Sequence, residues 1–257
     1  MERKKFDGKL NVEGKVCVLT GAGGGIGTDI SKIFAKNGVK MAMIDKADSV
    51  NKLAEDICAN GGEAFAVMDD ITNKTALQKI MNETVKRYGK IDILINGAAI
   101  GPNKKAEELT EKEWDDTFAV NLKPAFLLCQ MAALQMMKQG TGGKIINIAS
   151  QAATVAIHGH VSYSASKAAM IAMTKNMAHE WGKYGINVNT ISPTVVATPL
   201  ALSFWKGERA KKAIEEIPIG RFGYTDEIAA LCMFLSSDAS DLITGADYMI
   251  DGGYTIH

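Results

Sequence analysis

The stretch T-G-A-G-G-G-I-G at residues 20–27 sets the architecture of this chain. It follows the apolar run V-C-V-L of residues 16–19, which is short enough for a buried strand. It precedes residues 26–37, in which apolar side chains recur at helical spacing. A strand, a glycine turn and a helix in succession direct unpaired backbone N–H groups and the positive end of a helix dipole at one point. That point suits a pyrophosphate, although an ordinary tight loop would also use glycines.

Four residues of this turn are the predicted pyrophosphate contacts. We expect Gly21 to need a positive φ, Gly25 to let the phosphates approach closely, and Gly27 to let the helix pack tightly on the strand. Ile26 lies between the last two, at the start of the helix. The spacing differs from the commonest dinucleotide fingerprint, because three residues rather than one separate Gly21 from Gly25.

Asp45 is the predicted ribose contact. It ends a second apolar run, residues 39–44, and lies about 20 residues past the glycines. A carboxylate at this place accepts hydrogen bonds from both hydroxyls of the adenosine ribose and repels a 2′-phosphate, so the sequence predicts NAD as the cofactor rather than NADP. A solvated aspartate at a strand end is the alternative, and Lys46 beside it would soften the discrimination.

Composition excludes several classes of function. The 257 residues are 47% hydrophobic with a formal net charge of zero, and no basic block indicates nucleic acid. No apolar run approaches the roughly 20 residues of a membrane helix, and residues 1–9 are charged and lack a signal-peptide core. The cysteines form no C-x-x-C pair, so we expect neither structural zinc nor disulfides, no metal, and a cytoplasmic location. They are Cys17, Cys58, Cys129 and Cys232.

Strand-like and helix-like segments alternate along the chain. The expected strands are residues 16–20, 40–45, 64–68, 91–96, 144–149, 186–191 and 246–250. The later helices are expected at residues 49–60, 75–88, 114–139, 162–184 and 225–236. Continuous apolar strands separated by helices predict an α/β fold: one doubly wound Rossmann domain over residues 1–257, with a seven-stranded parallel sheet and helices on both faces. Residues 193–218 lack a clear signal and are expected to form a substrate-binding lid.

A catalytic group is predicted after the fifth strand. Tyr163 and Lys167 are four residues apart in a helical segment, so their side chains emerge on the same face. An ammonium beside a phenol favours the phenolate and lowers the pKa of the tyrosine. Ser150 ends the preceding strand, at the edge where doubly wound sheets bind ligands. A surface tyrosine beside a solvated lysine is the alternative reading of Y-x-x-x-K taken alone.

With these motifs the chain resembles the short-chain dehydrogenase/reductase family, from residue 14 to residue 253. The matching elements are the glycine turn, Asp70-Ile71, Asn96-Gly97-Ala98-Ala99, Asn121, Ser150, Tyr163-Ser164-Ala165-Ser166-Lys167, and Ser192-Pro193 through Thr198. Two motifs depart from the family pattern: Asn-Asn-Ala-Gly is here Asn96-Gly97-Ala98-Ala99, and Pro-Gly is Pro193-Thr194. Thr194 places a β-branched residue where the nicotinamide is expected.

The resemblance implies roles for individual residues. Tyr163 is the general acid or base, Lys167 lowers its pKa and holds the nicotinamide ribose, Ser150 aligns the substrate oxygen, and Asn121 anchors a water that relays the proton. For Asn121 a structural role at a helix bend is the alternative, and the two can coexist. The remaining cofactor contacts implied in this way are Asp70 and Ile71 around the adenine, Asn96 and Ala98 along the adenosine, and Pro193, Val196 and Thr198 at the nicotinamide.

The substrate is expected to be a small polyol or ketose. Residues 148–156, 191–198 and 219–225 resemble the sugar-alcohol branch, which includes D-threitol and galactitol dehydrogenases. Gln151 and His160 are then polar contacts for secondary hydroxyls, although His160 could instead cap its helix. The alternatives are a 3-oxoacyl-carrier or other carbonyl reductase, and a regulatory protein that binds the cofactor without chemistry. The family likeness further implies a homotetramer packed through residues 114–139 and 162–184.

Overall fold

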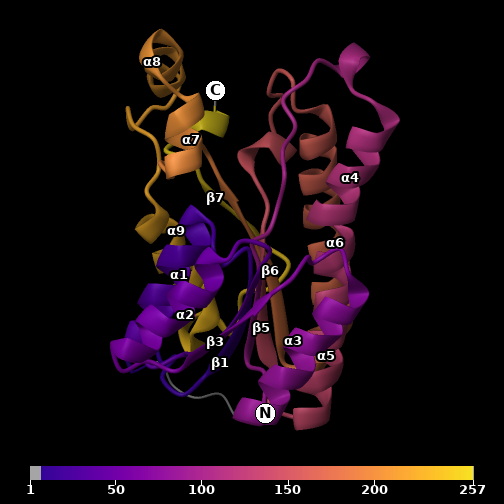
Figure 1. Cartoon of the computed structure of the whole chain (residues 1–257), viewed down its shortest axis with the longest axis vertical. Helices are drawn as coiled ribbons and strands as arrows, with labels where there is room; N and C mark the ends of the chain where they lie inside the picture. Colours follow the sequence, from indigo (N-terminus) through magenta and orange to yellow (C-terminus); the bar gives the residue numbers. More distant parts are fainter. Residues whose placement is uncertain (1–6, 257) are drawn as a thin grey trace.

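Seven parallel strands form a single sheet in the order β3-β2-β1-β4-β5-β6-β7 (Figure 1). The computed structural model describes residues 7–256. The strands are β1 Val16–Thr20, β2 Lys40–Asp45, β3 Ala64–Met68, β4 Ile93–Asn96, β5 Gly143–Ile148, β6 Ile186–Pro193 and β7 Asp247–Ile250. The order reverses between β1 and β4, which is the switch point where doubly wound sheets bind ligands. The predicted fold is confirmed, with strand bounds that agree to within two residues.

Helices cover both faces of the sheet (Figure 1). Their bounds are α1 Gly25–Lys36, α2 Ser49–Ala59, α3 Lys74–Tyr88, α4 Glu111–Asn121, α5 Lys123–Gln139, α6 Val161–Trp181, α7 Pro199–Phe204, α8 Gly207–Glu215 and α9 Thr225–Ser236. One core cluster lies under α1, α2 and α9, and a second lies under α3, α5 and α6. The interiors of the central strands β1, β2 and β4 are apolar on both sides because both faces are buried there.

Residues 114–139 were expected as one helix and form two. Helix α4 begins at a capping box, in which Thr110 and Glu113 satisfy each other's backbone N–H groups. It ends at Asn121, and α5 starts afresh at Lys123 with Pro124 in its first turn. Proline lacks an N–H group and clashes with the preceding turn, so a continuous helix is interrupted here. The break places Asn121 at the end of a helix, beside the sheet edge.

The same segment has the length and composition of a membrane span. A window of 18 residues within Glu111–Gln139 has a mean hydropathy of 1.3, so the expectation that no segment approaches a span is wrong for this one. The window is 44% buried inside the domain. Leu128, Ala132 and Met136 have no accessible surface and pack in the core with β4 and β5. Burial of this kind identifies a core helix of the folded domain.

Residues 193–218, which show no clear strand or helix signal in the sequence, carry two short helices, α7 and α8. Thr198 caps α7 by accepting a hydrogen bond from the Ala201 N–H, and Pro199 follows at the first helical position. Both helices lie beyond the carboxyl ends of the strands (Figure 1). None of their residues is fully buried.

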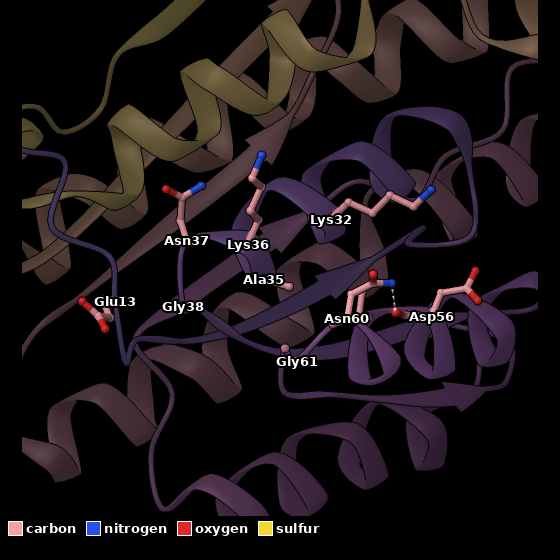
Figure 2. A pocket seen from close by; sticks show the side chains of 11 residues that line it. Glu13, Lys32, Ala35, Lys36, Asn37, Gly38, Asp56, Asn60 and Gly61 are labelled. Carbon is pink, nitrogen blue, oxygen red and sulfur yellow. Dashed lines mark hydrogen bonds between the residues drawn. The ribbon is translucent and has the colours of Figure 1, made fainter.

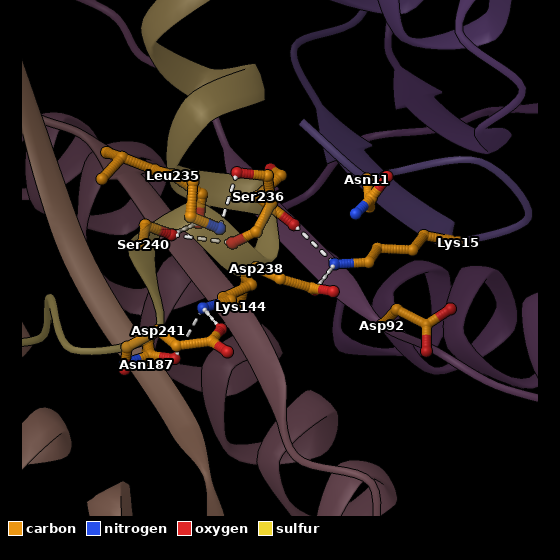
Figure 3. A network of polar contacts seen from close by, with 12 residues as sticks. Asn11, Lys15, Asp92, Lys144, Asn187, Leu235, Ser236, Asp238, Ser240 and Asp241 are labelled. Carbon is orange, nitrogen blue, oxygen red and sulfur yellow. Dashed lines mark hydrogen bonds and ion pairs between the residues drawn. The ribbon is translucent and has the colours of Figure 1, made fainter. Parts of the chain in front are cut away.

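The opposite, amino edge of the sheet is closed by a polar network (Figure 3). Lys15 pairs with Asp238 at 2.8 Å and donates to the carbonyl of Ser236. Lys144, at the start of β5, pairs with Asp241 at 2.7 Å and donates to the Asn187 side chain at 2.9 Å. These contacts connect the segment after α9 to the starts of β1, β5 and β6. They thereby stabilise the amino edge of the sheet, opposite the carboxyl edge where ligands are expected.

Candidate active site

The glycine turn packs directly against the end of β4. Gly21 has a φ of 71°, as predicted, and a Cβ added there would lie 2.8 Å from the Ala98 nitrogen. The Thr20 hydroxyl accepts hydrogen bonds from the N–H groups of Gly97 and Ala98, at 3.1 and 3.2 Å. A side chain at Gly27 would lie 2.2 Å from the Gly21 carbonyl oxygen. The turn therefore needs glycine at both positions to hold the strand-to-helix connection this tightly.

Gly25 lies under the segment that follows β6. A Cβ on Gly25 would come within 2.6 Å of the Thr198 methyl group, so two predicted cofactor contacts from distant parts of the sequence face each other. Helix α1 begins here with Gly24 at its N-cap and no side chain capping it. Its first-turn N–H groups, including that of Ile26, therefore remain available to an anion.

Asp45 ends β2 beside the same turn. Its carboxylate accepts hydrogen bonds from the Gly23 N–H and the Ala47 N–H, both at 2.9 Å. The side chain is thus held against the glycine turn rather than extending freely into solvent. Each carboxylate oxygen retains a further lone pair, so the bond to Gly23 orients the group without exhausting its capacity to accept.

The end of β3 places Asp70 and Ile71 next along the same edge. The Asp70 carboxylate accepts from the Thr72 N–H at 2.8 Å, and the pKa of this exposed group is lowered by its bonds to Thr72 and by the charge of Lys46. Ile71 is buried and packs in the core cluster under α3. Asp70 therefore has the more accessible side chain of the two.

Asn96 is the last residue of β4. Its side chain is 3% exposed and donates to the Asn147 side chain of β5 at 2.7 Å. Asn147 in turn donates to the Thr174 hydroxyl of α6 at 2.8 Å. Strand alternation turns the Asn96 side chain into the interior, where it links β4 to β5, so the adenosine contact of Asn96 stays a prediction that concerns its backbone. The backbone of Gly97 and Ala98 is what meets the glycine turn.

Tyr163, Lys167 and Ser150 come together at the carboxyl end of β5. Ser150 follows the strand in an extended conformation and its hydroxyl accepts from the Ala152 N–H at 3.2 Å. Tyr163 and Lys167 lie one turn apart on α6, with the Lys167 Nζ 5.6 Å from the centre of the Tyr163 ring. The Lys167 ammonium donates to the Ile148 carbonyl at 2.6 Å, which anchors α6 to the end of β5.

Burial dominates the ionisation of this group in the protein alone. Burial raises the pKa of Tyr163, against a smaller lowering by a hydrogen bond with Ser150. Burial also lowers the pKa of Lys167 to about 8, because the low dielectric disfavours the ammonium. The expected lowering of the phenol pKa by Lys167 is therefore not met by the cofactor-free chain, in which desolvation outweighs it. A further positive charge beside the phenol is required to bring its pKa toward neutrality.

Asn121 has a structural role that is fully visible. Its side chain accepts from the Ile100 N–H at 2.8 Å and donates to the Ile100 carbonyl at 2.9 Å and the Ser166 hydroxyl at 3.0 Å. It thus joins the loop after β4 to the catalytic helix. The main-chain carbonyl of Asn121 accepts no backbone hydrogen bond within residues 7–256, because the break before α5 and Pro124 remove the usual donors.

Two supporting residues were missed from the sequence. Ser166 accepts from Asn121 and donates to the Tyr163 carbonyl at 2.7 Å, so it fixes the turn of α6 that carries the phenol. Gly101 lies on the Tyr163 ring: a Cβ there would be 3.2 Å from Cδ2. The Y-S-A-S-K stretch contained a signal for Ser166, since it lies next to Lys167. Nothing local identified Gly101, whose role depends on a ring 62 positions away.

The predicted substrate contacts lie around this group. Gln151 directly follows Ser150, is 4% exposed, and has a carbonyl oxygen with no partner among the described residues. The His160 ring meets Tyr163 edge-on, 6.0 Å between ring centres, and its Nδ1 lies 3.0 Å from the His158 carbonyl oxygen. His160 occupies the N-cap position of α6 but makes no capping bond with its side chain, so the capping alternative is not supported.

Pro193 and Val196 continue the site from β6. Pro193 is the last residue of that strand and pairs with Ile250 of β7. Val196 is buried and forms an isolated parallel bridge with Gly223, which holds the segment before α7 against the segment before α9. The predicted nicotinamide contacts thus leave the sheet beside Ser150, because β5 and β6 are neighbours in register.

A separate hollow lies at the far end of α1 (Figure 2). It opens between the last turns of α1 and α2 and is lined by a mixture of charges: Glu13, Lys32, Lys36 and Asp56. Asn60 donates to the Asp56 carbonyl at 2.7 Å, so the polar groups here satisfy the helix end. Because α1 separates it from the glycine turn and none of the predicted catalytic residues lines it, this hollow is not the active site.

Comparisons with known proteins agree with this geometry. A family profile described as enoyl-(acyl carrier protein) reductase matches residues 21–255. The chain is 45% identical to an NAD-dependent glycerol dehydrogenase of Listeria innocua over 256 residues, covering 100% of both chains. It is 44% identical to a D-threitol dehydrogenase of Mycolicibacterium smegmatis, covering 98% of this chain and 96% of that one. A solved short-chain dehydrogenase/reductase from Serratia marcescens superposes with a TM-score of 0.89 at 34% identity, over 95% and 99% of the two chains.

Proposed function

The chain belongs to the short-chain dehydrogenase/reductase family, and within it we propose an NAD-dependent dehydrogenase that oxidises a secondary alcohol of a small polyol, or reduces the corresponding ketose. The observation that carries the proposal is the placement of Tyr163 on α6 between Ser150 and the buried ammonium of Lys167, at the sheet edge that also carries the glycine turn. Full-length similarity to two polyol dehydrogenases supports the choice of substrate.

The residues present fit a dinucleotide. Gly21, Gly25 and Gly27 leave a surface without side chains before the open N-terminus of α1, and a Cβ at any of them would meet neighbouring atoms. The N-terminus of α1 would hold the pyrophosphate, Asp45 the adenosine ribose, and Val196 and Thr198 the nicotinamide end. When bound, NAD supplies the hydride acceptor and a positive charge near the phenol.

Tyr163 acts as the general base in oxidation. Its phenolate accepts the proton of the substrate hydroxyl while Ser150 donates a hydrogen bond that aligns the same oxygen. Lys167 stabilises the phenolate that accepts this proton, since the ammonium lies on the same helix face one turn away. The free main-chain carbonyl of Asn121 anchors the water through which the proton leaves toward solvent, while its side chain keeps the loop after β4 in place.

A polyol fits the groups around Tyr163. Gln151 presents an amide that can both donate and accept, and the His160 ring meets the Tyr163 ring edge-on. A site built to hydrogen-bond hydroxyls discriminates against analogues that lack them, because its buried polar groups are left unpaired. A reductase for acyl chains would need an apolar pocket in this place.

Further parts of the proposal concern specificity and assembly. Asp45 favours NAD over NADP by repelling a 2′-phosphate. Helices α7 and α8 form the lid over the substrate, with the exposed Phe204 and the half-buried Trp205 against the Arg209 guanidinium. The protein acts in the cytoplasm as a homotetramer that packs through α4, α5 and α6, where Trp114, Phe126 and Leu134 present apolar surface.

A substrate panel tests the proposed function. Purified protein is assayed by NADH absorbance with glycerol, C4 to C6 polyols, the matching ketoses and 2-butanol, each with NAD and with NADP. We expect turnover of at least one tetritol or hexitol with NAD. Gln151→Leu should lower kcat/KM for that polyol at least about tenfold more than for 2-butanol. Preference for a hydrophobic ketone or an acyl thioester would assign the protein to the carbonyl reductases instead. Absence of any turnover would favour the regulatory reading.

A further inference from the structure

Four buried side-chain atoms in the described part of the chain have no hydrogen-bond partner. They are Asn96 Oδ1, Gln151 Oε1, Thr194 Oγ1 and Ser236 Oγ. Buried polar groups are nearly always paired, and leaving one unpaired destabilises the folded protein. Asn96 lies in the core and Ser236 lies at the amino edge beside the Lys15 network. Gln151 and Thr194 both follow strands at the catalytic edge, so their unpaired atoms coincide with the site.

Thr194 directly follows β6 and is the last of three alternate residues that carry hydroxyls, after Thr190 and Ser192. Thr190 and Ser192 each donate to the Asp247 carboxylate at 2.7 Å. Thr194 comes one step further along, where its N–H still bonds to the Ile250 carbonyl at 3.3 Å but its hydroxyl finds no carboxylate. The side chain is 9% exposed. The hydroxyls of Thr190 and Ser192 within β6 are therefore hydrogen-bonded, whereas the hydroxyl of Thr194, directly after the strand, has no partner.

The Thr194 hydroxyl lies on the catalytic side of the sheet. Side chains alternate along a strand, so Thr190 and Ser192 share a face with Val188, and Thr194 follows in the same alternation directly after the strand. Val188 packs in the cluster that includes Met177 and Ala178 of α6. That helix carries Tyr163 and Lys167.

Gln151 follows the neighbouring strand. Ile148, the last residue of β5, pairs with Ile191 of β6, so Gln151 and Thr194 come three residues after two paired positions and leave the sheet from adjacent strands. An unpaired carbonyl oxygen and an unpaired hydroxyl thus occupy adjacent strand ends, flanking Ser150 and Pro193. A neutral ligand group that both donates and accepts would pair with both.

We propose that Thr194 is a specificity-determining residue whose hydroxyl, together with the Gln151 carbonyl, recognises a neutral hydroxyl or primary amide of a ligand bound at the ends of β5 and β6. This rests on the proposed function. Two sources offer that chemistry: a hydroxyl of the polyol, and the carboxamide of the nicotinamide. The hydroxyl of Thr194 is the determinant, and its methyl group fills space.

Isosteric replacement tests the hydroxyl. Thr194→Val keeps the shape and removes the hydrogen bond, Thr194→Ser keeps the hydroxyl, and Ser236→Ala removes a comparably unpaired hydroxyl far from the site. For each variant the Kd of NAD is measured by calorimetry, and kcat/KM is measured for D-threitol and for 2-butanol. Thermal midpoints show whether each variant is folded.

We expect Thr194→Val to change one of the two measured quantities by about tenfold: either the Kd of NAD rises or kcat/KM for D-threitol falls. A tenfold change is the effect of losing one hydrogen bond to a ligand. A loss in kcat/KM for D-threitol but not 2-butanol identifies the polyol hydroxyl, and a weaker Kd for NAD identifies the carboxamide. Thr194→Ser should remain within about threefold of the wild type, and Ser236→Ala should change neither quantity.

Three outcomes would overturn the inference. One is a folded Thr194→Val protein whose NAD Kd and D-threitol kcat/KM stay within about twofold of the wild type. Another is an equal loss in Thr194→Ser, which would assign the effect to the methyl group. The third is an equal loss in Ser236→Ala. If the wild-type enzyme turns over no polyol, the proposed function is refuted instead. The role of Thr194 is then decided by the Kd of NAD alone.

Discussion

The two edges of the sheet each bury a lysine, and the two lysines are held in opposite ways. Lys144, at the amino edge, is 7% exposed and pairs with Asp241 at 2.7 Å, with Asn187 as a second partner (Figure 3). Lys167, at the carboxyl edge, is 2% exposed, and its ammonium contacts a single carbonyl oxygen, that of Ile148. Burial lowers the pKa of both.

The carboxylates differ in the same sense. At the amino edge Asp238 and Asp241 each neutralise a lysine. At the carboxyl edge Asp45 accepts only backbone N–H groups. A buried charge without a counterion is costly, and persists where a function requires it. The comparison indicates that the charged groups at the amino edge stabilise the fold by pairing with each other. The charged and polar groups at the carboxyl edge lack such partners and are available to bind ligands.

The largest effect should come from removing the phenol oxygen at the carboxyl edge. Tyr163→Phe deletes the oxygen of the proposed general base, so kcat should fall by at least about 10³-fold. Folding and NAD binding should be spared, because the ring still packs on Gly101. Steady-state kinetics and NAD titration check this. Near-wild-type turnover in the variant would exclude the assigned mechanism.

Lys167→Met sharpens the comparison between the two lysines. It removes the charge that favours the phenolate, so kcat should fall by about 10²-fold, and the residual activity should require a higher pH. The variant should be at least as stable as the wild type, because it replaces an unpaired buried cation with an apolar chain of similar length. A large fall in the thermal midpoint would show that Lys167 is primarily structural.

The pH dependence of stability should distinguish the wild type from Lys167→Met. The folded-state pKa of Lys167 is about 8, against 10.5 for an unperturbed lysine. Between these values the unfolded chain holds a proton that the folded chain has lost, so raising the pH should stabilise the cofactor-free protein by up to about 1.4 kcal/mol per pH unit. In Lys167→Met this contribution should vanish. Urea unfolding from pH 8 to 10.5 measures the free energy of unfolding of both proteins. Lys144 is present in both, so its contribution cancels in the difference between them.

Asp45→Ser tests whether the carboxylate at the ligand edge serves a ligand. The wild type should prefer NAD over NADP by at least about tenfold in kcat/KM. The variant should lose most of that preference, mainly by weaker use of NAD, and should become slightly less stable because Gly23 loses its acceptor. Equal use of both cofactors by the wild type would indicate that Lys46 governs the site.

The smallest effect should follow Lys144→Met at the amino edge. Turnover should stay within about twofold of the wild type, since the residue lies at the opposite end of β5 from Ser150. The free energy of unfolding should fall by about 1 kcal/mol, because Asn187 loses a donor while Asp241 remains largely exposed to water. If Lys144→Met lost as much activity as Lys167→Met, the assignment of stability to the amino edge and of function to the carboxyl edge would be contradicted.

Local sequence was sufficient for the architecture. Apolar runs, glycines and helical spacing are short-range signals, and they predicted every strand of the sheet to within two residues. The positive φ of Gly21 and the one-turn separation of Tyr163 and Lys167 likewise follow from the nearest neighbours in the chain. These features could be derived from the sequence because the backbone itself imposes them.

Burial and pairing were decided only by the tertiary structure. The amide of Asn96 turns inward to a partner 51 positions away, and Lys144 meets a carboxylate 97 positions away. Lysines and threonines occur throughout the sequence. The sequence does not show that the Lys167 ammonium binds a carbonyl oxygen rather than a carboxylate, or that the Thr194 hydroxyl has no partner among the described residues. Whether a polar group is satisfied depends on which distant segments pack around it, and desolvation then sets its pKa and its availability to a ligand.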